Sequence, residues 1–303
     1  MKKDGITLNF VEMKSMAEHK IRCAGVPEHF CYPWRMVSRD REWSEVMTWT
    51  EFPGGTGAMS AALRIAEIDV AVLLTEGAVA EILKGNPSSI YSYYVDSPLN
   101  WGVHVNASSN ILTVADIEEP QFAISRFNSG SHLMAFLYCR DHAWTLNEDS
   151  FDVVNNLDGA RQSMREHTDQ LFMWEKFTTK PWVDNGEFRR VDEYIGPWSS
   201  FVIVVRNEIL AQRLEEIKAL VAAVQFTASN IKAHPRGVDA IARAYGLNAD
   251  DAKTWFEDVR WSRSSLIDPL DIKKVAQTLA DVGVLDVTDD AALAQVLFSS
   301  TTV

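Results

Sequence analysis

Cysteine is scarce in this sequence. The 303 residues include three cysteines, Cys23, Cys31 and Cys139, and no two of them form a Cys-x-x-Cys pair. Three cysteines cannot build a disulfide framework. Unpaired cysteines are typical of a reducing compartment, so we expect a cytoplasmic protein.

Long apolar runs are missing as well. No stretch approaches the roughly 20 apolar residues that a membrane-spanning helix needs. The chain begins MKKDGITLNFVEMKSMAEHK, which has two early lysines but no apolar core of a secretory signal. We therefore expect no membrane span and no cleaved leader.

Positive charge is in deficit. The chain has 42 acidic and 29 basic residues, which gives a formal net charge of −13 and a pI of about 5.0. An acidic protein is repelled by a phosphate backbone and by an anionic membrane surface. The expected partner is therefore a small molecule and not a nucleic acid, with a protein partner only if the chain is regulatory.

Motifs of catalysis and cofactor binding are also absent. The sequence has no HExxH, no GxSxG, no P-loop and no GxGxxG, and its histidines and cysteines are not spaced as metal ligands. Pairs of carboxylates are too numerous to single one out. We expect no catalytic residue, no metal and no cofactor, and we favour a binding protein over an enzyme.

Short apolar runs alternate with helical patterns along most of the chain. Such alternation is typical of α/β folds whose sheets are covered by helices. It occurs twice, so we expect two lobes, each a mainly parallel sheet flanked by helices. The strands are predicted at 20–26, 45–52 and 69–74 in the first set, at 121–125, 151–155 and 170–174 in the second, and at 90–96, 101–106 and 201–205 between and after them.

Two proline-marked segments connect the predicted lobes, and a helical tail follows. SPLN at 97–100 and GPW at 196–198 each lead from one strand to the next, as hinge crossings or as plain surface turns. From 207 onward apolar residues recur at helical spacing, and this tail should pack onto one lobe. The expected division is 20–97 plus 198–303 for the first lobe, 98–197 for the second, and 1–19 as an N-terminal extension.

Polar and glycine-rich segments stand where the predicted strands end. In open parallel sheets the ligand crevice lies outside the carboxyl ends of the strands. If the strand ends of both lobes face each other, these segments surround one cleft. They are Glu28-His29, Gly54-Gly55-Thr56-Gly57, Thr75-Glu76, the segment from Arg126 to Ser131, and Trp174-Glu175.

Two of these segments have an alternative structural interpretation. The glycines at 54–57 either make a tight turn or let backbone N–H groups approach a ligand at the start of a helix. The Ser129-Gly130-Ser131 turn is explained in part by a helix N-cap. An N-cap does not explain the neighbouring Arg126, which suits an anionic or carbonyl-bearing ligand.

The acids and tryptophans suggest the rest of the ligand. Three glutamates at three strand ends favour an amine or a protonated ring nitrogen, although each alone could be a solvated charge. Together with Arg126 they favour a zwitterion or an amino-heteroaromatic compound. Stacking on a planar ligand is plausible for three of the ten tryptophans, Trp101, Trp174 and Trp198.

Several segments resemble one known family. VPEHF, EFPGGTGAM, EIDVAVLLTEGAVAEILKGN, SPLNWGV, ISRFNSGSHLMAF, LFMWEKFTTKPW and GPWSSFVIVV together resemble type II periplasmic-binding-protein folds over about residues 20–285. The branch is that of nitrate, sulfonate and taurine binders and thiamine-pyrimidine synthases. Within it the chain looks most like intracellular, leaderless homologues with no assigned ligand. The synthases' cysteine-rich iron motif and dedicated lysine have no match here.

The resemblance implies a venus-flytrap fold that closes about a hinge on a pyrimidine-, sulfonate- or amino-acid-like ligand. The alternatives are an enzyme of thiamine pyrimidine-precursor metabolism and a ligand-sensing regulatory module. By position in the family, the ligand-facing residues are Glu28, His29, Gly55, Thr56, Thr75, Glu76, Arg126, Ser129, Gly130, Ser131, Trp174 and Glu175, to which the stacking argument adds Trp101.

Overall fold

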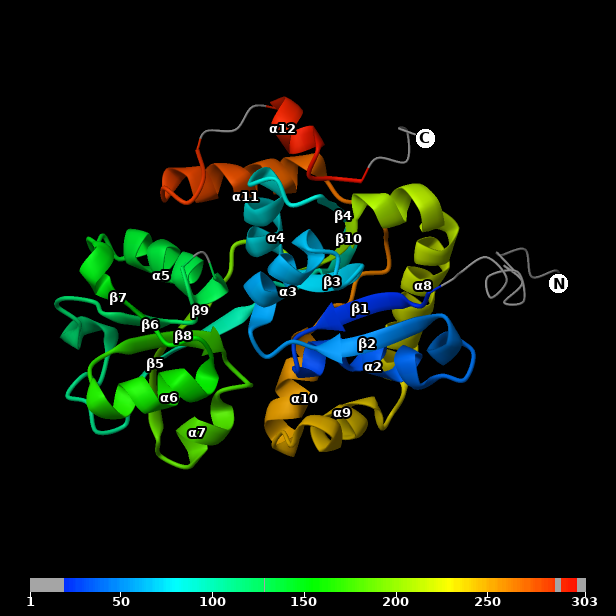
Figure 1. The fold of residues 1–303 in the computed structure, drawn as a ribbon. Coiled ribbons are helices and arrows are strands. Elements are labelled where there is room, and N and C mark those ends of the chain that lie inside the picture. Colours follow the sequence, from blue (N-terminus) through cyan, green and yellow to red (C-terminus); the bar gives the residue numbers. More distant parts are fainter. Residues whose placement is uncertain (1–18, 128, 287–289, 299–303) are drawn as a thin grey trace.

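The strands form two five-stranded sheets that lie side by side (Figure 1). The computed structural model describes residues 19–127, 129–286 and 290–298, so all but the last residue of the predicted extension 1–19 lies outside the described residues. The first sheet has the order β2-β1-β3-β10-β4 and the second the order β7-β6-β8-β5-β9. Each sheet takes its strands from the residues predicted for one lobe; the lobe boundaries themselves stay a prediction.

The first sheet combines four strands from the N-terminal part of the chain with β10, which comes about a hundred residues later. Strand β3 reads VAVLL and is almost entirely buried, as a strand covered by helices requires. The strands are β1 (Ile21–Gly25), β2 (Met47–Glu51), β3 (Val70–Leu74), β4 (Ser88–Val95) and β10 (Phe201–Arg206).

The second sheet is built from one continuous part of the chain. Its strand β9 is absent from the sequence prediction, because its half-buried, charged sequence FRRVDEYI lacks an apolar run. The strands are β5 (Asn100–Asn106), β6 (Phe122–Ile124), β7 (Phe151–Val153), β8 (Leu171–Glu175) and β9 (Phe188–Ile195).

Both sheets are mainly parallel, as expected, and each is mixed because one of its strands runs in the opposite direction. Strand β1 pairs in parallel with β2 and β3, and β6 with β7 and β8. Strand β10 is antiparallel to β3 and β4, and β5 is antiparallel to β8 and β9. The α/β fold class itself is confirmed, with the antiparallel strands entering where the chain passes from one sheet to the other.

Helices cover both sheets, and the C-terminal tail packs onto the first (Figure 1). Helix α8 contacts α2 and β10, and α11 contacts α4. The helices around the first sheet are α2 (Tyr32–Arg39), α3 (Gly55–Arg64), α4 (Thr75–Leu83), α8 (Asn207–Ala233), α9 (Gly237–Tyr245), α10 (Ala249–Asp258), α11 (Pro269–Asp281) and α12 (Asp290–Ala294), and those around the second are α5 (Gly130–Asp141), α6 (Leu157–Glu166) and α7 (Lys180–Asp184).

The two proline-marked crossings run together between the sheets. The Ser200 N–H and hydroxyl both donate to the Ser97 carbonyl, at 3.2 and 2.8 Å. The Gly196 N–H donates to the Leu99 carbonyl at 2.9 Å. The two connections are thus hydrogen-bonded to each other.

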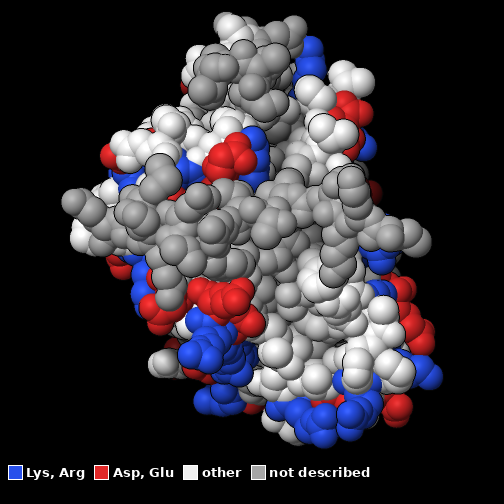
Figure 2. Space-filling model, turned by 90° about the vertical axis from the view of Figure 1, so that its right-hand side faces the viewer, with Lys and Arg blue, Asp and Glu red and all other residues white. Residues whose placement is uncertain are grey.

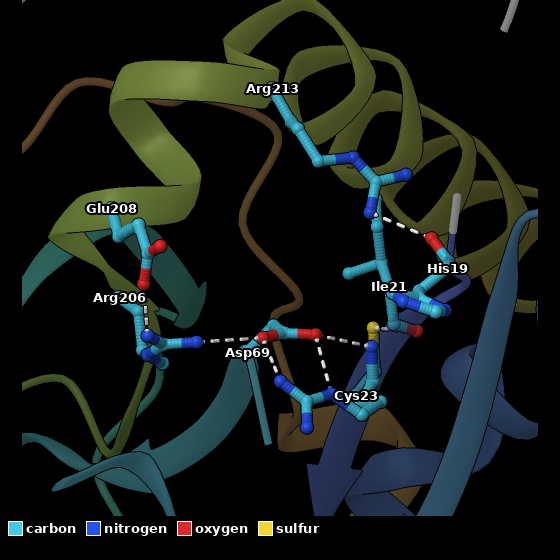
Figure 3. A network of polar contacts seen from close by, with 8 residues as sticks. His19, Ile21, Cys23, Asp69, Arg206, Glu208 and Arg213 are labelled. Carbon is cyan, nitrogen blue, oxygen red and sulfur yellow. Dashed lines mark hydrogen bonds and ion pairs between the residues drawn. The ribbon is translucent and has the colours of Figure 1, made fainter. Parts of the chain in front are cut away.

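A buried carboxylate holds the first sheet together at the amino end of β3 (Figure 3). Asp69 accepts hydrogen bonds from the Arg22 Nε at 2.9 Å and the Arg22 Nη2 at 2.6 Å. It also accepts one from the Arg206 Nη1 at 3.1 Å. Because Arg22 lies on β1 and Arg206 ends β10, one carboxylate links three adjacent strands.

Charges of both signs mix on the outer face that Figure 2 shows, where Lys and Arg groups lie beside Asp and Glu groups on the described residues. Over the described part of the chain, no helix has both the length and the apolar character for crossing a membrane.

Candidate functional site

A cavity of about 60 Å³ lies where the carboxyl ends of the strands meet. By the space that one water needs, this volume accommodates a handful of water molecules, or a small ligand. Both sheets contribute to its wall, as expected for a crevice at strand ends. The lining residues are Val26, Glu28, Gly54, Gly55, Thr56, Leu74, Leu99, Trp101, Ser125, Arg126, Ser129, Gly130, Ser131, Trp174, Glu175 and Phe201.

Arg126 crosses the cavity from the second sheet to the first. It follows β6, and its Nη1 donates to the Gly54 carbonyl at 2.7 Å. Burial lowers the pKa of its guanidinium, an effect that the charge of Glu81 partly offsets. Among the described residues no carboxylate forms an ion pair with Arg126, and the hydrogen-bond partner of its half-buried guanidinium is the Gly54 carbonyl.

Helix α5 points its N-terminus at the same cavity. Its N-cap is Ser129, whose hydroxyl accepts from the His132 N–H at 3.3 Å. The Ser131 hydroxyl accepts from the Ser125 N–H at 3.0 Å and lies 3.0 Å from the Ser129 hydroxyl. Gly130 lets this turn approach the first sheet, since a Cβ there would lie 2.4 Å from the Leu74 Cδ1. The N-cap interpretation of the serines thus holds, and they line the cavity as well.

Helix α3 begins on the opposite wall. Its N-cap, Gly54, provides no side-chain cap, and Gly55 has φ +66, a left-handed conformation that favours glycine. The Thr56 hydroxyl accepts from the Leu74 N–H at 3.1 Å, which joins the start of α3 to the end of β3. The helix N-termini of α3 and α5 both contribute partial positive charge to the cavity.

Two carboxyl groups lie on the remaining side. Glu28 follows β1, and Glu175 ends β8. Burial and the nearby Glu175 charge raise the pKa of Glu28 to about 8, against which a hydrogen bond from Trp174 acts. Burial raises the pKa of Glu175 to about 7, although it accepts from the Thr178 N–H at 2.6 Å and the Thr178 hydroxyl at 2.8 Å. Near neutral pH, at least one of these two carboxyl groups is therefore protonated when no cation is bound beside them.

Three of the predicted ligand residues do not line the cavity. His29 is 1% exposed and packs on Phe30 and Trp255. Its Nε2 lies 3.8 Å from the Glu175 Oε2 without a hydrogen bond, and burial lowers its pKa to about 3, so it is neutral.

The other two, Thr75 and Glu76, form hydrogen bonds with the second crossing, the segment that leads into β10. The Thr75 hydroxyl donates to the Ser199 carbonyl at 2.5 Å. The Glu76 carboxyl accepts from the Trp198 Nε1 at 2.7 Å, and burial raises its pKa to about 7. These side chains point to the second crossing and not to the cavity. Trp198, predicted for stacking, is thereby engaged by Glu76.

Ten predicted residues do line the cavity, and six lining residues lie outside the predicted set. The ten are Glu28, Gly55, Thr56, Trp101, Arg126, Ser129, Gly130, Ser131, Trp174 and Glu175. The six are Val26, Gly54, Leu74, Leu99, Ser125 and Phe201, mostly apolar residues at strand ends that carry no chemical signal in a sequence. Among the described residues, no three His, Cys, Asp or Glu side chains group as metal ligands.

The two mixed sheets, the paired crossings and the cavity between them define a type II periplasmic-binding-protein fold. The sequence resemblance predicts this fold, and the solved structures described below share it. Residues 101–194 match the family described as Ca3427-like PBP.

Solved structures support this assignment. The Candida albicans CA3427 gene product, which exhibits the generic periplasmic binding protein fold, superposes with a TM-score of 0.83 at 28% identity over 91% of this chain and 94% of that one. The alkanesulfonate-binding protein SsuA from Xanthomonas axonopodis pv. citri gives 0.74 at 13% identity, over 92% and 97%.

A third similar structure is the nitrate-binding protein NrtA from Synechocystis PCC 6803, with a TM-score of 0.69 at 11% identity over 91% of this chain and 84% of that one. At such low identities the last two similarities concern the fold alone. No curated protein matches the chain by sequence.

Proposed function

We propose that this protein captures a small ligand in the cavity between its sheets and that an anionic group of the ligand binds Arg126. The observation that carries the proposal is a partly buried guanidinium with no carboxylate partner among the described residues. The starts of α3 and α5 face the same space and add positive potential. A carboxylate, sulfonate or phosphate would accept charge-assisted hydrogen bonds from these donors.

The opposite side of the cavity favours a nitrogen-bearing group on the same ligand. Glu175 is buried and Glu28 is partly buried, and no neighbouring Lys or Arg side chain forms an ion pair with either among the described residues. A protonated amine or ring nitrogen would favour the ionised form of both groups and bind them as carboxylates. Trp101 and Trp174 supply flat apolar walls. A zwitterion or an amino-heteroaromatic compound of the size of a pyrimidine, an aminosulfonate or an amino acid fits this arrangement.

Similar proteins favour a binding role. SsuA is named for alkanesulfonate binding and NrtA for nitrate binding. In this chain, closure about the two crossings would bury the ligand, and bound and free states would differ in the angle between the sheets. We place this binding in the cytosol, because the three cysteines are free and buried.

A matched ligand panel tests the proposal. Titration calorimetry would compare ethanesulfonate, taurine, an aminopyrimidine and the common amino acids on the intact chain, with the fluorescence of Trp101 and Trp174 as a second readout. The expected result is binding of at least one compound that carries an anionic group. Arg126→Gln should weaken that binding by at least about tenfold through loss of a charge-assisted hydrogen bond.

Arg64→Gln is the matched control. Arg64 lies on α3, but it pairs with Glu81 at 3.4 Å on the surface and does not line the cavity. This variant should bind like the parent chain. Equal binding by the parent chain and by Arg126→Gln would refute the proposed anion site, and a panel without any binder would refute ligand capture.

An acid–base enzyme is the second candidate, and the carboxyl pair favours it. Groups with pKa values moved to about 7 and 8 in a cavity are suited to exchange protons with a bound compound. The thiamine pyrimidine-precursor activity considered from the sequence belongs to this class. Mass spectrometry of a panel compound after prolonged incubation distinguishes the candidates, since a binder returns it unchanged. A sensor would bind the same ligand and additionally recruit a protein partner.

A further inference from the structure

Gly57 meets Arg126 at closer range than any side chain would permit. A Cβ at position 57 would lie 2.0 Å from the Arg126 Nε, 2.3 Å from its Nη2 and 2.4 Å from its Cζ. All three of these nearest atoms belong to one guanidinium. Gly57 lies on α3, beside the first sheet, whereas Arg126 follows β6 of the second sheet.

The backbone alone does not call for glycine at this position. Gly57 is not among the residues with positive φ, and it lies inside α3, which runs from Gly55 to Arg64. In a helix interior alanine is favoured over glycine. The glycine therefore weakens the helix locally, and a larger residue there would displace the Arg126 guanidinium from its present position.

We propose that Gly57 and Arg126 form a latch that determines how far the two sheets close. The missing side chain at position 57 leaves a slot on α3, into which the guanidinium fits while its Nη1 bonds the Gly54 carbonyl. This inference rests on the proposed function, because closure matters only if the cavity captures a ligand. Gly57 is a positioning residue that acts through Arg126.

Electrostatics makes the latch responsive to a ligand. The guanidinium lies beside the first turn of α3, where the helix dipole is positive, so its position there is unfavourable without an anion. A carbonyl oxygen compensates only part of this repulsion. An anionic ligand group in the adjoining cavity would neutralise the charge and hold Arg126 in its slot, and the closed form would then be favoured.

A double-mutant cycle on the full chain tests the latch without any ligand. The four proteins are the parent, Gly57→Ala, Arg126→Ala and the double variant, and the measurement is the thermal unfolding midpoint. In the Arg126→Ala background, alanine at position 57 has no guanidinium to displace and should raise the midpoint by about 2 °C through helix propensity. In the parent background the same substitution should lower it.

Solution scattering gives the second readout, in which Gly57→Ala should enlarge the radius of gyration only when Arg126 is present. If Gly57→Ala shifts the midpoint and the radius equally with and without Arg126, the latch is refuted. That outcome is distinct from failure of the proposed function. A chain that binds a panel compound but shows no coupling refutes the latch alone, whereas coupling without any binder refutes ligand capture alone.

Discussion

At the scale of single residues, the site depends on ionisable groups that are buried or half-buried and lack an oppositely charged partner among the described residues. Arg126 has a carbonyl in place of a carboxylate, and Glu28 and Glu175 face each other across the two sheets. Buried charges are costly unless they are paired. Among the described residues, the cavity thus combines a guanidinium that has no carboxylate partner with two carboxyl groups of raised pKa, and a ligand of complementary charge would stabilise both.

The carboxyl pair predicts a pH dependence of stability. Because the pKa values of Glu28 and Glu175 rise from 4.5 to about 8 and about 7, the folded state binds more protons than the unfolded state between these values. Stability should therefore increase as pH falls from about 8 to about 5.5, by about 5 kcal/mol from this pair. Urea unfolding at the two pH values measures it.

The double variant Glu28→Gln, Glu175→Gln serves as the control for this dependence. Its amides mimic protonated carboxyls, so it should lose most of the gain in stability between these pH values. If parent and variant follow the same pH profile, the pair is ionised and solvated in the folded protein, contrary to its burial.

The contact between Glu76 and Trp198 predicts a stability effect at the hinge. Glu76→Ala would leave the indole N–H of Trp198 without its acceptor, at a cost of about 1–3 kcal/mol in the free energy of unfolding. Glu76→Gln keeps an acceptor and should lose less. Guanidinium unfolding of the two variants decides this, and equal losses would show that the hydrogen bond contributes nothing.

Individual site residues could be predicted only in part from the sequence. Strand-end polarity pointed to Arg126 and to the serine turn, because position after a strand is visible in a sequence. The direction of a side chain is not visible. Glu28 faces the cavity, while the next residue, His29, turns into the core against Trp255 as a 3-10 helix begins. The apolar wall residues carry no chemical signal at all.

At the scale of helices and strands, the contacts of Asp69 with Arg22 and Arg206 join three strands of the first sheet (Figure 3). Hydrogen bonds and ion pairs from Arg22 and Arg206 lower the pKa of Asp69 against the effect of its burial. Asp69→Asn should lower the free energy of unfolding by about 2 kcal/mol, because two charge-assisted contacts would be lost. Thermal and urea unfolding at pH 7 measure it.

The same network sets a second pH effect, opposite in sign to that of the cavity. Since the pKa of Asp69 is lowered, its contribution is present above the unfolded value and is lost as pH falls below it. The stability difference between parent and Asp69→Asn should thus shrink between pH 5 and pH 3. A difference that stays constant over this range would contradict the ion-pair account.

Elements with an apolar run were predictable, and pairings between distant ones were not. The apolar runs VAVLL and FVIVV predict strands β3 and β10. The antiparallel pairing of β10 with β3 joins residues more than a hundred positions apart, and no local pattern encodes it. Strand β9 is half-buried and charged, so its sequence does not distinguish it from a loop.

At the scale of the whole molecule, our proposal requires one sheet to rotate against the other about the two crossings. Contacts across the gap, such as that between Lys180 of α7 and Asp251 of α10 at 3.5 Å, join the two halves beyond the cavity. A bound ligand should favour this closed arrangement and decrease the radius of gyration in solution scattering. Arg126→Gln, measured at the same ligand concentration, should not compact.

The sequence indicated this architecture through its family resemblance more than through its patterns. Alternating strands and helices predict an α/β fold, and the two prolines suggest a hinge. The two sheets form one site because Glu28 interacts with Glu175 and Gly57 contacts Arg126. Residue spacing in the sequence does not predict such long-range contacts.

The most direct test is a crystal structure of the protein grown with the tightest-binding compound of the panel. Our account predicts that the compound lies between the two sheets, with its anionic group within hydrogen-bonding distance of the Arg126 guanidinium and its nitrogen beside Glu28 and Glu175. A compound bound outside this cavity, with the Arg126 guanidinium still on the Gly54 carbonyl and no ligand beside it, would contradict the account.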